Sequence, residues 1–262
     1  MTKEITHNRV VFTIDDETDS LMSIRVIGAY FVSEVFIPHF LPGGERIKYL
    51  SNDFCNDCFD KVIIDNGIQV NASAFRNAAV TEVVWNDCAV IPSCCFLNSS
   101  VKKVTNIKDV TKIGPSAFEG SAAEEFIWPS GCLKIPIKCF KSSSLKRISN
   151  INHITSIDSE AFAFSRIEDI VWPSKCPTVP RQCFIGTPLS KISNTDCIEE
   201  VRTNAFCLYF ITNPEFSIDL SKNMVTIIEE GAFAYCKHKD IILPYYISEE
   251  DKEKAFCVVD ED

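Results

Sequence analysis

Apolar residues recur along the chain at a fixed spacing of about 22 residues. This period is a stronger guide to the fold than any local pattern. Phenylalanine anchors mark it at Phe54, Phe75, Phe96, Phe118, Phe140, Phe162, Phe184 and Phe206, and Phe233 follows after a longer step. Most anchors have an apolar residue five positions before them and further apolar residues five and eight positions after them. Such a period predicts a solenoid, in which each coil buries its apolar face against the next.

The residues five, eight and ten positions after each anchor form the pattern LxxIxI, which is typical of the strand in a leucine-rich repeat. Below, a numbered position counts residues after the anchor. Alternate side chains of a strand face the same side. Positions eight and ten are therefore expected to point inward, and positions seven and nine to face outward on a parallel sheet. The predicted fold class is an α/β-type solenoid, mostly β, with coils of about 22 residues.

Position ten alternates between two residue types, which gives a second period of 44 residues. Tryptophan occupies it at Trp85, Trp128 and Trp172, and asparagine at Asn106, Asn150 and Asn194. We expect each indole to pack in the core across two coils. The asparagines are expected to end the intervening strands through side-chain bonds to the backbone. The alternative is an exposed tryptophan stripe that binds a ligand.

Positions six and seven alternate in charge. They are occupied by Glu82, Lys102–Lys103, Glu124–Glu125, Lys146–Arg147, Glu168–Asp169 and Lys191. Because adjacent parallel strands lie about 4.8 Å apart, each acidic strand should be flanked by basic ones in a ladder of opposite charges. A slip by one coil would place like charges side by side, so the ladder is expected to fix the register.

Position nine alternates between apolar and hydroxyl side chains. Val84, Ile127 and Val171 occupy one set of coils, and Thr105, Ser149 and Ser193 the other. The resulting face is banded, nearly neutral and moderately apolar, which suits a protein ligand better than a polyanion. The candidate protein-binding residues are Val84, Ile127 and Val171 with the flanking charges Lys103, Glu125, Arg147 and Asp169. A self-neutralised structural face is the alternative.

The repeated unit resembles the BspA-like leucine-rich repeat. The resemblance rests on VTKIGPSAFEGS (110–121), ITSIDSEAFAFS (154–165) and VTIIEEGAFAYC (225–236), with the variants IPSCCFLNSS (91–100) and VPRQCFIGTP (179–188), and it covers roughly residues 47 to 244. It implies a right-handed leucine-rich-repeat horseshoe with a parallel sheet on the concave face. It also implies recognition, because such proteins are similar to adhesins and surface antigens.

The two ends of the chain depart from the repeat. Residues 1–45 are expected to form an N-terminal cap, with the runs Arg9–Ile14 and Leu21–Ile27 as a hairpin or a pair of irregular strands. The repeats then occupy residues 46–244. Residues 245–262 are expected to form an acidic C-terminal cap or tail, in which Ser248 caps a short helix over EEDKEKAF.

Charge, apolar runs and cysteines limit the possible partners and the cellular location. A net charge of −10 disfavours nucleic acid and anionic membranes as partners. The sequence has no apolar run long enough to span a membrane and no signal peptide. The 13 cysteines are odd in number, and several recur at the 44-residue period, as Cys95, Cys139 and Cys183 do. The odd number and the missing export signal favour reduced thiols and a cytoplasmic location, and the fixed phase favours packing of these thiols in the core. A disulfide framework at the cell surface is the alternative.

Motifs for catalysis or metal binding are missing from the sequence. The four histidines fit no metal spacing, and the pair Cys55-x-x-Cys58 lacks the second pair that a zinc site needs. We therefore expect no enzyme activity and no cofactor. The predicted function is a non-catalytic protein–protein interaction solenoid. The sequence identifies neither its protein partner nor its oligomeric state. The alternatives are a cell-surface adhesin that binds host or matrix proteins and an intracellular component of a cytoskeletal assembly.

Overall fold

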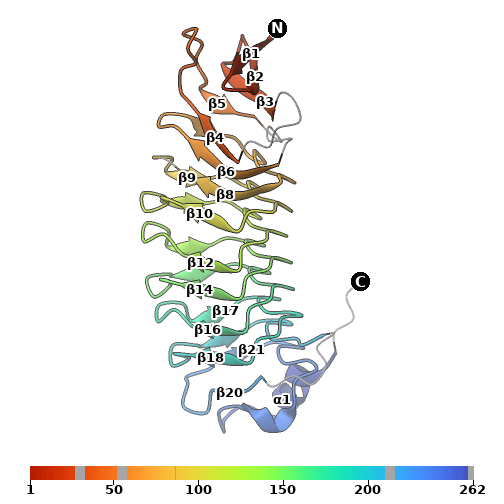
Figure 1. The fold of residues 1–262 in the computed structure, drawn as a ribbon. Coiled ribbons are helices and arrows are strands. Elements are labelled where there is room, and N and C mark those ends of the chain that lie inside the picture. The colour runs from red at the N-terminus through yellow and green to blue at the C-terminus, as the bar shows by residue number, and fades with distance from the viewer. Residues whose placement is uncertain (27–32, 52–57, 86, 210–215, 259–262) are drawn as a thin grey trace. The chain divides into compact units, whose positions relative to one another are not determined.

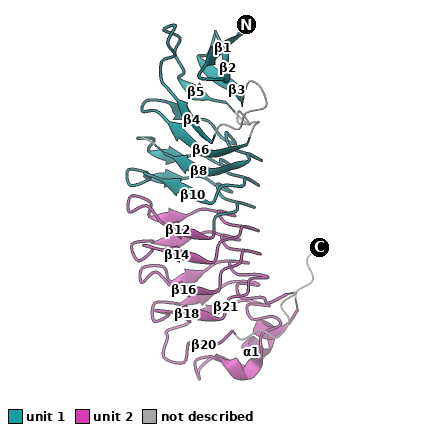
Figure 2. Ribbon diagram, in the orientation of Figure 1, with its two compact units in different colours: residues 1–123 teal, residues 124–262 magenta. Residues whose placement is uncertain are grey.

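The computed structural model describes residues 1–26, 33–51, 58–85, 87–209 and 216–258 (Figure 1). The chain divides into two compact units, residues 1–123 and 124–262 (Figure 2). Short β strands joined by turns make up most of each unit. Among the described residues there is one α-helix, α1 (Glu249–Phe256), in the second unit.

The first sheet of unit 1 begins with an antiparallel meander. It is formed by β1 (Thr2–His7), β2 (Val10–Asp15) and β3 (Ser20–Val26), and it continues by parallel pairing into β5 (Tyr49–Leu50) and β7 (Gln69–Val70). The predicted hairpin is confirmed as β2 and β3. The strand β1 was not predicted, because Thr2–His7 has no buried face that would reveal it: its burial pattern is exposed at most positions.

The second sheet of unit 1 is wholly parallel and carries the outward positions. Its strands, in order, are β10 (Lys103–Thr105), β8 (Val80–Val84), β6 (Phe59–Ile64) and β4 (Glu34–Ile37). A smaller parallel pair joins β9 (Val90–Ile91) to β11 (Lys112–Ile113). Strand β4 lies inside the segment that we assigned to the cap, so the sheet begins before residue 45. The period misses β4 because no phenylalanine stands seven residues before Glu34.

The described part of unit 2 has a series of four three-residue strands and a parallel series of five two-residue strands. The longer series is β12 (Glu125–Ile127), β14 (Arg147–Ser149), β16 (Asp169–Val171) and β18 (Lys191–Ser193); the shorter is β13 (Lys134–Ile135), β15 (Ser156–Ile157), β17 (Thr178–Val179), β19 (Glu200–Val201) and β21 (Ile227–Ile228). Two further strands, β20 (Ile218–Asp219) and β22 (Ile241–Ile242), pair in parallel, and the 3-10 turn η1 (His238–Asp240) precedes β22. Every ladder in both series is parallel, which confirms the predicted solenoid.

The phenylalanine anchors form a continuous stack of rings inside each unit. In unit 2 the ring of Phe162 lies 6.0 Å from that of Phe140 and 5.5 Å from that of Phe184, with nearly parallel planes. In unit 1 the rings of Phe96 and Phe118 lie 5.2 Å apart. These anchors are fully buried, so the predicted core is confirmed. Phe54 lies outside the described residues.

The alternation at position ten separates buried tryptophan from exposed asparagine. The three indoles are at most 1% exposed, and that of Trp172 lies 6.1 Å from the ring of the next anchor, Phe184. Core packing across two coils is therefore confirmed. Asn150 and Asn194 donate from Nδ2 to the carbonyl oxygens of Trp128 and Trp172 at 2.7 and 2.6 Å. This confirms the predicted backbone bond.

The expectation that position ten always points inward is wrong for asparagine. Asn106, Asn150 and Asn194 are exposed, and their φ angles are 59°, 60° and 61°. Because a positive φ turns the backbone away from the strand direction, the side chain leaves the core at the residue that ends the strand. Asparagine tolerates this left-handed conformation better than most residues.

Replacing Asn150 with alanine is expected to lower the free energy of unfolding by about 2 kcal/mol, because it adds left-handed strain to the loss of a hydrogen bond. Asn150→Gly keeps the conformation accessible, so its loss should be smaller by about 1 kcal/mol. Urea unfolding of both variants measures the difference. Equal losses would show that the backbone conformation at residue 150 carries no strain.

The predicted C-terminal helix is confirmed, and it also supplies a tenth anchor. The Ser248 hydroxyl oxygen accepts from the Asp251 N–H at the N-terminus of α1. At its C-terminus the Phe233 N–H donates to the Ala255 carbonyl at 2.8 Å, and the Phe256 ring lies 5.9 Å from that of Phe233. Residues 255–256 thus occupy the Ala-Phe position of a further coil inside the segment that we assigned to a cap or tail.

Candidate protein-binding surface

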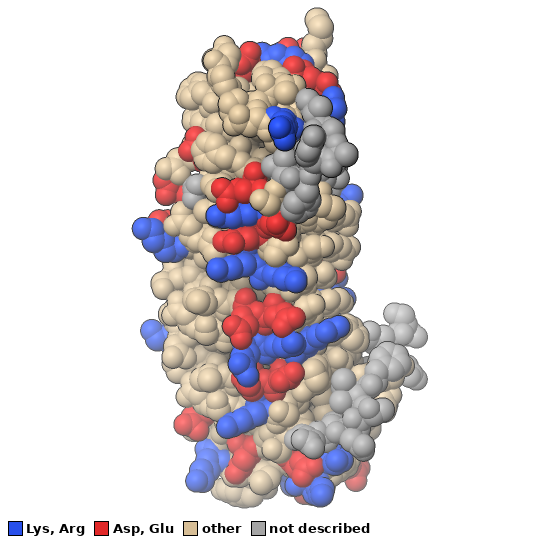
Figure 3. Space-filling model, viewed as in Figure 1, with Lys and Arg blue, Asp and Glu red and all other residues tan. Residues whose placement is uncertain are grey.

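The outward face of unit 2 carries the charge ladder on β12, β14, β16 and β18, and we call it the banded face. In the sheet register Glu125 stands beside Arg147, and Asp169 beside Lys191. Arg147 Nη1 lies 3.8 Å from Glu125 Oε1, and at position six Lys146 Nζ lies 2.9 Å from Glu124 Oε2. Figure 3 shows acidic and basic bands alternating along this face. The predicted ladder is confirmed for these strands.

Exposed apolar side chains line position nine of the same face. Ile127 is 69% exposed and Val171 is 52% exposed. In the register Ile127 stands beside Ser149, and Val171 beside Ser193. The inward neighbours Phe126 and Ile170 are buried, so the strand pleat separates a core side from an outer side as predicted. Ile127 and Val171 lie outside the core and present apolar surface to solvent.

Unit 1 repeats this arrangement on β4, β6, β8 and β10. The charge row there is Glu34, Lys61, Glu82 and Lys103, and the row at position nine is Phe36, Ile63, Val84 and Thr105. Lys61 Nζ lies 3.1 Å from Glu34 Oε2. Phe36 is 50% exposed, whereas Val84 is half-buried.

The seven predicted residues therefore divide between two faces. Val84 and Lys103 lie on the face of unit 1, and Glu125, Ile127, Arg147, Asp169 and Val171 lie on the banded face of unit 2. Sequence reasoning missed Phe36 and Ile63, which extend the apolar row of unit 1. The alternation of residues in EVFI (34–37) and FDKVII (59–64) could have revealed both as outward-facing strand residues.

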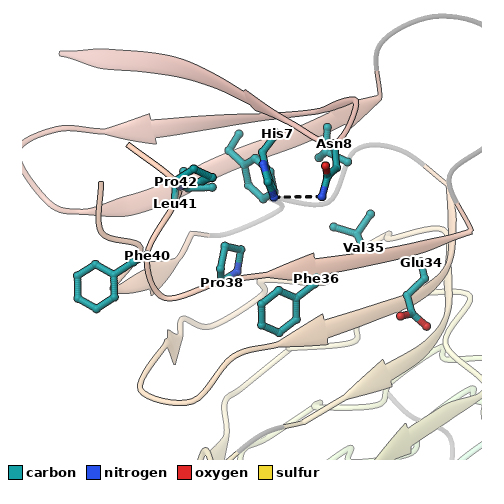
Figure 4. A pocket seen from close by; sticks show the side chains of 11 residues that line it. His7, Asn8, Glu34, Val35, Phe36, Pro38, Phe40, Leu41 and Pro42 are labelled. Atoms are coloured by element: carbon teal, nitrogen blue, oxygen red, sulfur yellow. Dashed lines mark hydrogen bonds between the residues drawn. The ribbon is translucent and has the colours of Figure 1, made fainter. Parts of the chain in front are cut away.

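A cavity of about 380 Å³ opens beside the row of unit 1 (Figure 4). Phe36 and Glu34 on β4 line one side, and His7 and Asn8 at the end of β1 line the other. Phe40, which is 60% exposed, also lines it. The cavity therefore continues the exposed apolar surface of unit 1 toward its N-terminal hairpin.

Most of the cysteines that recur at the 44-residue period fill the core, whereas Cys88 is only half-buried. Cys95, Cys139 and Cys183 are fully buried, and burial raises the pKa of each thiol well above its ordinary value. Burial also raises the pKa of Cys132 to about 11. A thiol with a raised pKa is a poor nucleophile and metal ligand at neutral pH. The predicted packing role of these residues is confirmed.

In the described part of the chain, no group of three histidine, cysteine, aspartate or glutamate residues is placed to hold a metal ion. Of the isolated pair, Cys58 is exposed and Cys55 lies outside the described residues. None of the helices described is long and apolar enough to cross a membrane.

Buried anchors, two series of parallel strands and a 22-residue coil together define a leucine-rich-repeat solenoid. The family model of the BspA type leucine rich repeat region matches residues 68–190 and 199–257 in six copies. These ranges cover more than half of the chain, so the chain belongs to this family. Repeats of this kind generally form non-enzymatic scaffolds that mediate protein interactions.

Three solved structures are similar to this chain. A leucine rich cell surface protein from Faecalibacterium prausnitzii A2-165 is 14% identical, with 99% of each chain covered and a TM-score of 0.40. A leucine-rich repeat protein from Bacteroides ovatus is 15% identical, with 93% of this chain and 83% of that one covered and a TM-score of 0.43. One from Eubacterium ventriosum is 15% identical, with 98% and 92% covered and a TM-score of 0.35. No curated protein sequence matches this chain.

Proposed function

We propose that the chain is a non-catalytic solenoid that recognises a protein partner through the outward side of its longer strands, above all through the banded face of unit 2. The observation that carries the proposal is the exposure of Ile127 and Val171 at alternate coils of an ordered sheet. Apolar side chains surrounded by polar ones are the arrangement found at the centre of protein interfaces.

The charges around these residues favour a protein over a polyanion. Each acidic strand of the banded face stands beside a basic one, as Glu125 does beside Arg147. Positive and negative potentials therefore cancel over the face as a whole. Nucleic acids need a basic stripe to replace their counterions, and this face has none. A protein with its own alternating charges could pair with the bands one by one.

Backbone hydrogen bonds join the neighbouring coils of the banded face. The Trp128 N–H donates to the Ser149 carbonyl at 2.9 Å, and the Lys146 N–H donates to the Glu124 carbonyl at 2.8 Å. Such bonds hold neighbouring coils in register. Because the strands are already held in register, binding of a partner should carry little entropic cost for ordering them.

Replacing Ile127 and Val171 together with aspartate is expected to weaken partner capture strongly. The change places two new charges at the centre of the interface, each of which loses its hydration when a partner covers it. We would immobilise the full chain, expose it to an extract of the cells that produce it, and quantify bound proteins by mass spectrometry. Capture should fall by about tenfold or more for the true partner.

The matched control changes two exposed apolar residues outside the banded face. Leu133 and Ile242 are 56% and 49% exposed, and they lie before β13 and in β22. The Leu133→Asp/Ile242→Asp variant adds the same charge, so its capture should equal that of the wild type. Circular dichroism spectra that match the wild type would show that both variants fold. Undiminished capture by folded Ile127→Asp/Val171→Asp would rule out the banded face.

A further inference from the structure

We propose that the banded face binds the banded face of a second copy of this chain. The inference rests on the proposed function, because it names the partner of the same surface. Its basis is the order of the charges at position seven, which runs acidic, basic, acidic, basic through Glu125, Arg147, Asp169 and Lys191. An even number of alternating charges becomes complementary to itself when its order is reversed.

A two-fold axis parallel to the strands performs this reversal. It turns two faces toward each other, inverts the order of the coils, and leaves each residue's place along its strand unchanged. Glu125 then faces Lys191 of the second copy, and Arg147 faces Asp169. The two-fold repeats both contacts, so all four opposed pairs join unlike charges.

The same operation matches side-chain size at position nine. Ile127 faces Ser193 of the second copy, and Val171 faces Ser149. Each large apolar side chain therefore meets a small one across the interface, and the row of one copy fits the gaps in the row of the other. Ile127 and Val171, which stand 69% and 52% exposed in the single chain, would lose that exposure in the dimer.

Other arrangements of the two faces do not pair unlike charges at position seven and large with small side chains at position nine. A shift by one coil moves one face past the other by about 4.8 Å. Glu125 then faces Asp169, and Arg147 faces Arg147 of the second copy, so every opposed pair joins like charges. An axis parallel to the stack of coils instead places position seven opposite position nine. The charges of each copy would then face serine or apolar side chains and lose their hydration without a partner. The ladder thus selects one orientation and one register.

The face is small, which sets the concentration range of the experiment. Four strands of three residues, about 4.8 Å apart, cover only a few hundred Å² per copy. Standard interfaces bury about 800 Å² per partner. We therefore expect a weak dimer, with a dissociation constant of roughly micromolar to hundreds of micromolar. Its stability should decrease with added salt, since the pairs are electrostatic.

Two charge reversals test the pairing directly. In a homodimer, Arg147→Glu places its new carboxylate opposite Asp169 twice, and Asp169→Arg places its new guanidinium opposite Arg147 twice. Each variant alone should self-associate at least about tenfold more weakly than the wild type. In an equal mixture of the two variants every opposed pair is unlike again, so a mixed dimer should form. Sedimentation velocity on the full chains, up to about 300 µM and in low salt, measures all three.

The control is Lys134→Glu, which reverses a charge in β13, where Lys134 Nζ lies 2.9 Å from Asp158 Oδ2. It disturbs a similar ion pair away from the banded face and should leave the dimer intact. A wild type that stays monomeric, or a mixture that stays as dissociated as its components, would overturn the inference. Capture of a different protein that requires Ile127 and Val171 would at the same time sustain the proposed function, so the two failures are distinguishable.

Discussion

Replacing Phe162 with alanine is expected to lower the free energy of unfolding by about 3–5 kcal/mol. Its ring is fully buried and lies between the rings of Phe140 and Phe184, 6.0 and 5.5 Å away. The Phe162 N–H also donates to the Cys183 carbonyl at 3.1 Å. Because backbone bonds of this kind fix the spacing of the coils, the neighbours cannot close the cavity, and the stack of rings is interrupted.

The matched control removes a second phenylalanine from the same coil. Phe164 is 41% exposed, so Phe164→Ala loses less buried area, and its effect should stay below about 1 kcal/mol. Urea unfolding followed by circular dichroism gives both values, with equal slopes as a check on cooperativity. A loss at Phe162 no greater than that at Phe164 would contradict the account of the core.

Alkylation of the native protein at pH 8 is expected to modify Cys257 at least about a hundredfold faster than Cys139. Cys257 is exposed, whereas Cys139 is fully buried and its pKa is raised well above the ordinary value by burial. Few thiolates form at Cys139, and reagent reaches them only when the coil opens. Peptide mass spectrometry of timed samples measures both rates. Similar rates would show that the core thiols are accessible.

Two other buried thiols, those of Cys132 and Cys176, make the stability of the fold depend on pH in the alkaline range. In the folded chain burial raises the pKa of Cys132 and Cys176 to about 11, above the ordinary value of 9.0. Between these two values the unfolded chain loses protons that the folded chain keeps. Stability should therefore be unaffected by these groups below pH 9 and decrease as the pH rises from 9 toward 11.

The regular coils could be predicted from the sequence because each position recurs in several of them. A single apolar residue such as Ile170 indicates little, but the same position is apolar in coil after coil, and only stacking explains that. The charge ladder followed from the same alignment. It placed Arg147 beside Glu125 and Lys191 beside Asp169, as the structure does.

The ends of the array could not be predicted in this way, because their spacing differs. Strand β4 has no phenylalanine anchor before it, so Phe36 was assigned to a cap. Phe256 follows the anchor Phe233 by 23 residues and is the last residue of a helix. The six charged residues before the Ala-Phe pair in EEDKEKAF indicate an exposed helix, not a buried coil. The exposure of Asn150 depends on a backbone angle that alternation alone does not reveal.

Side-by-side capture with two variants of the full chain tests the central claim most directly. One variant carries aspartate at positions 127 and 171, on the banded face; the other carries aspartate at positions 133 and 242, away from it. If the banded face is the binding surface, the first variant loses its partner, whether that partner is another protein or a second copy, and the second variant keeps it. If folded protein of the first variant binds as well as the wild type, the claim is wrong.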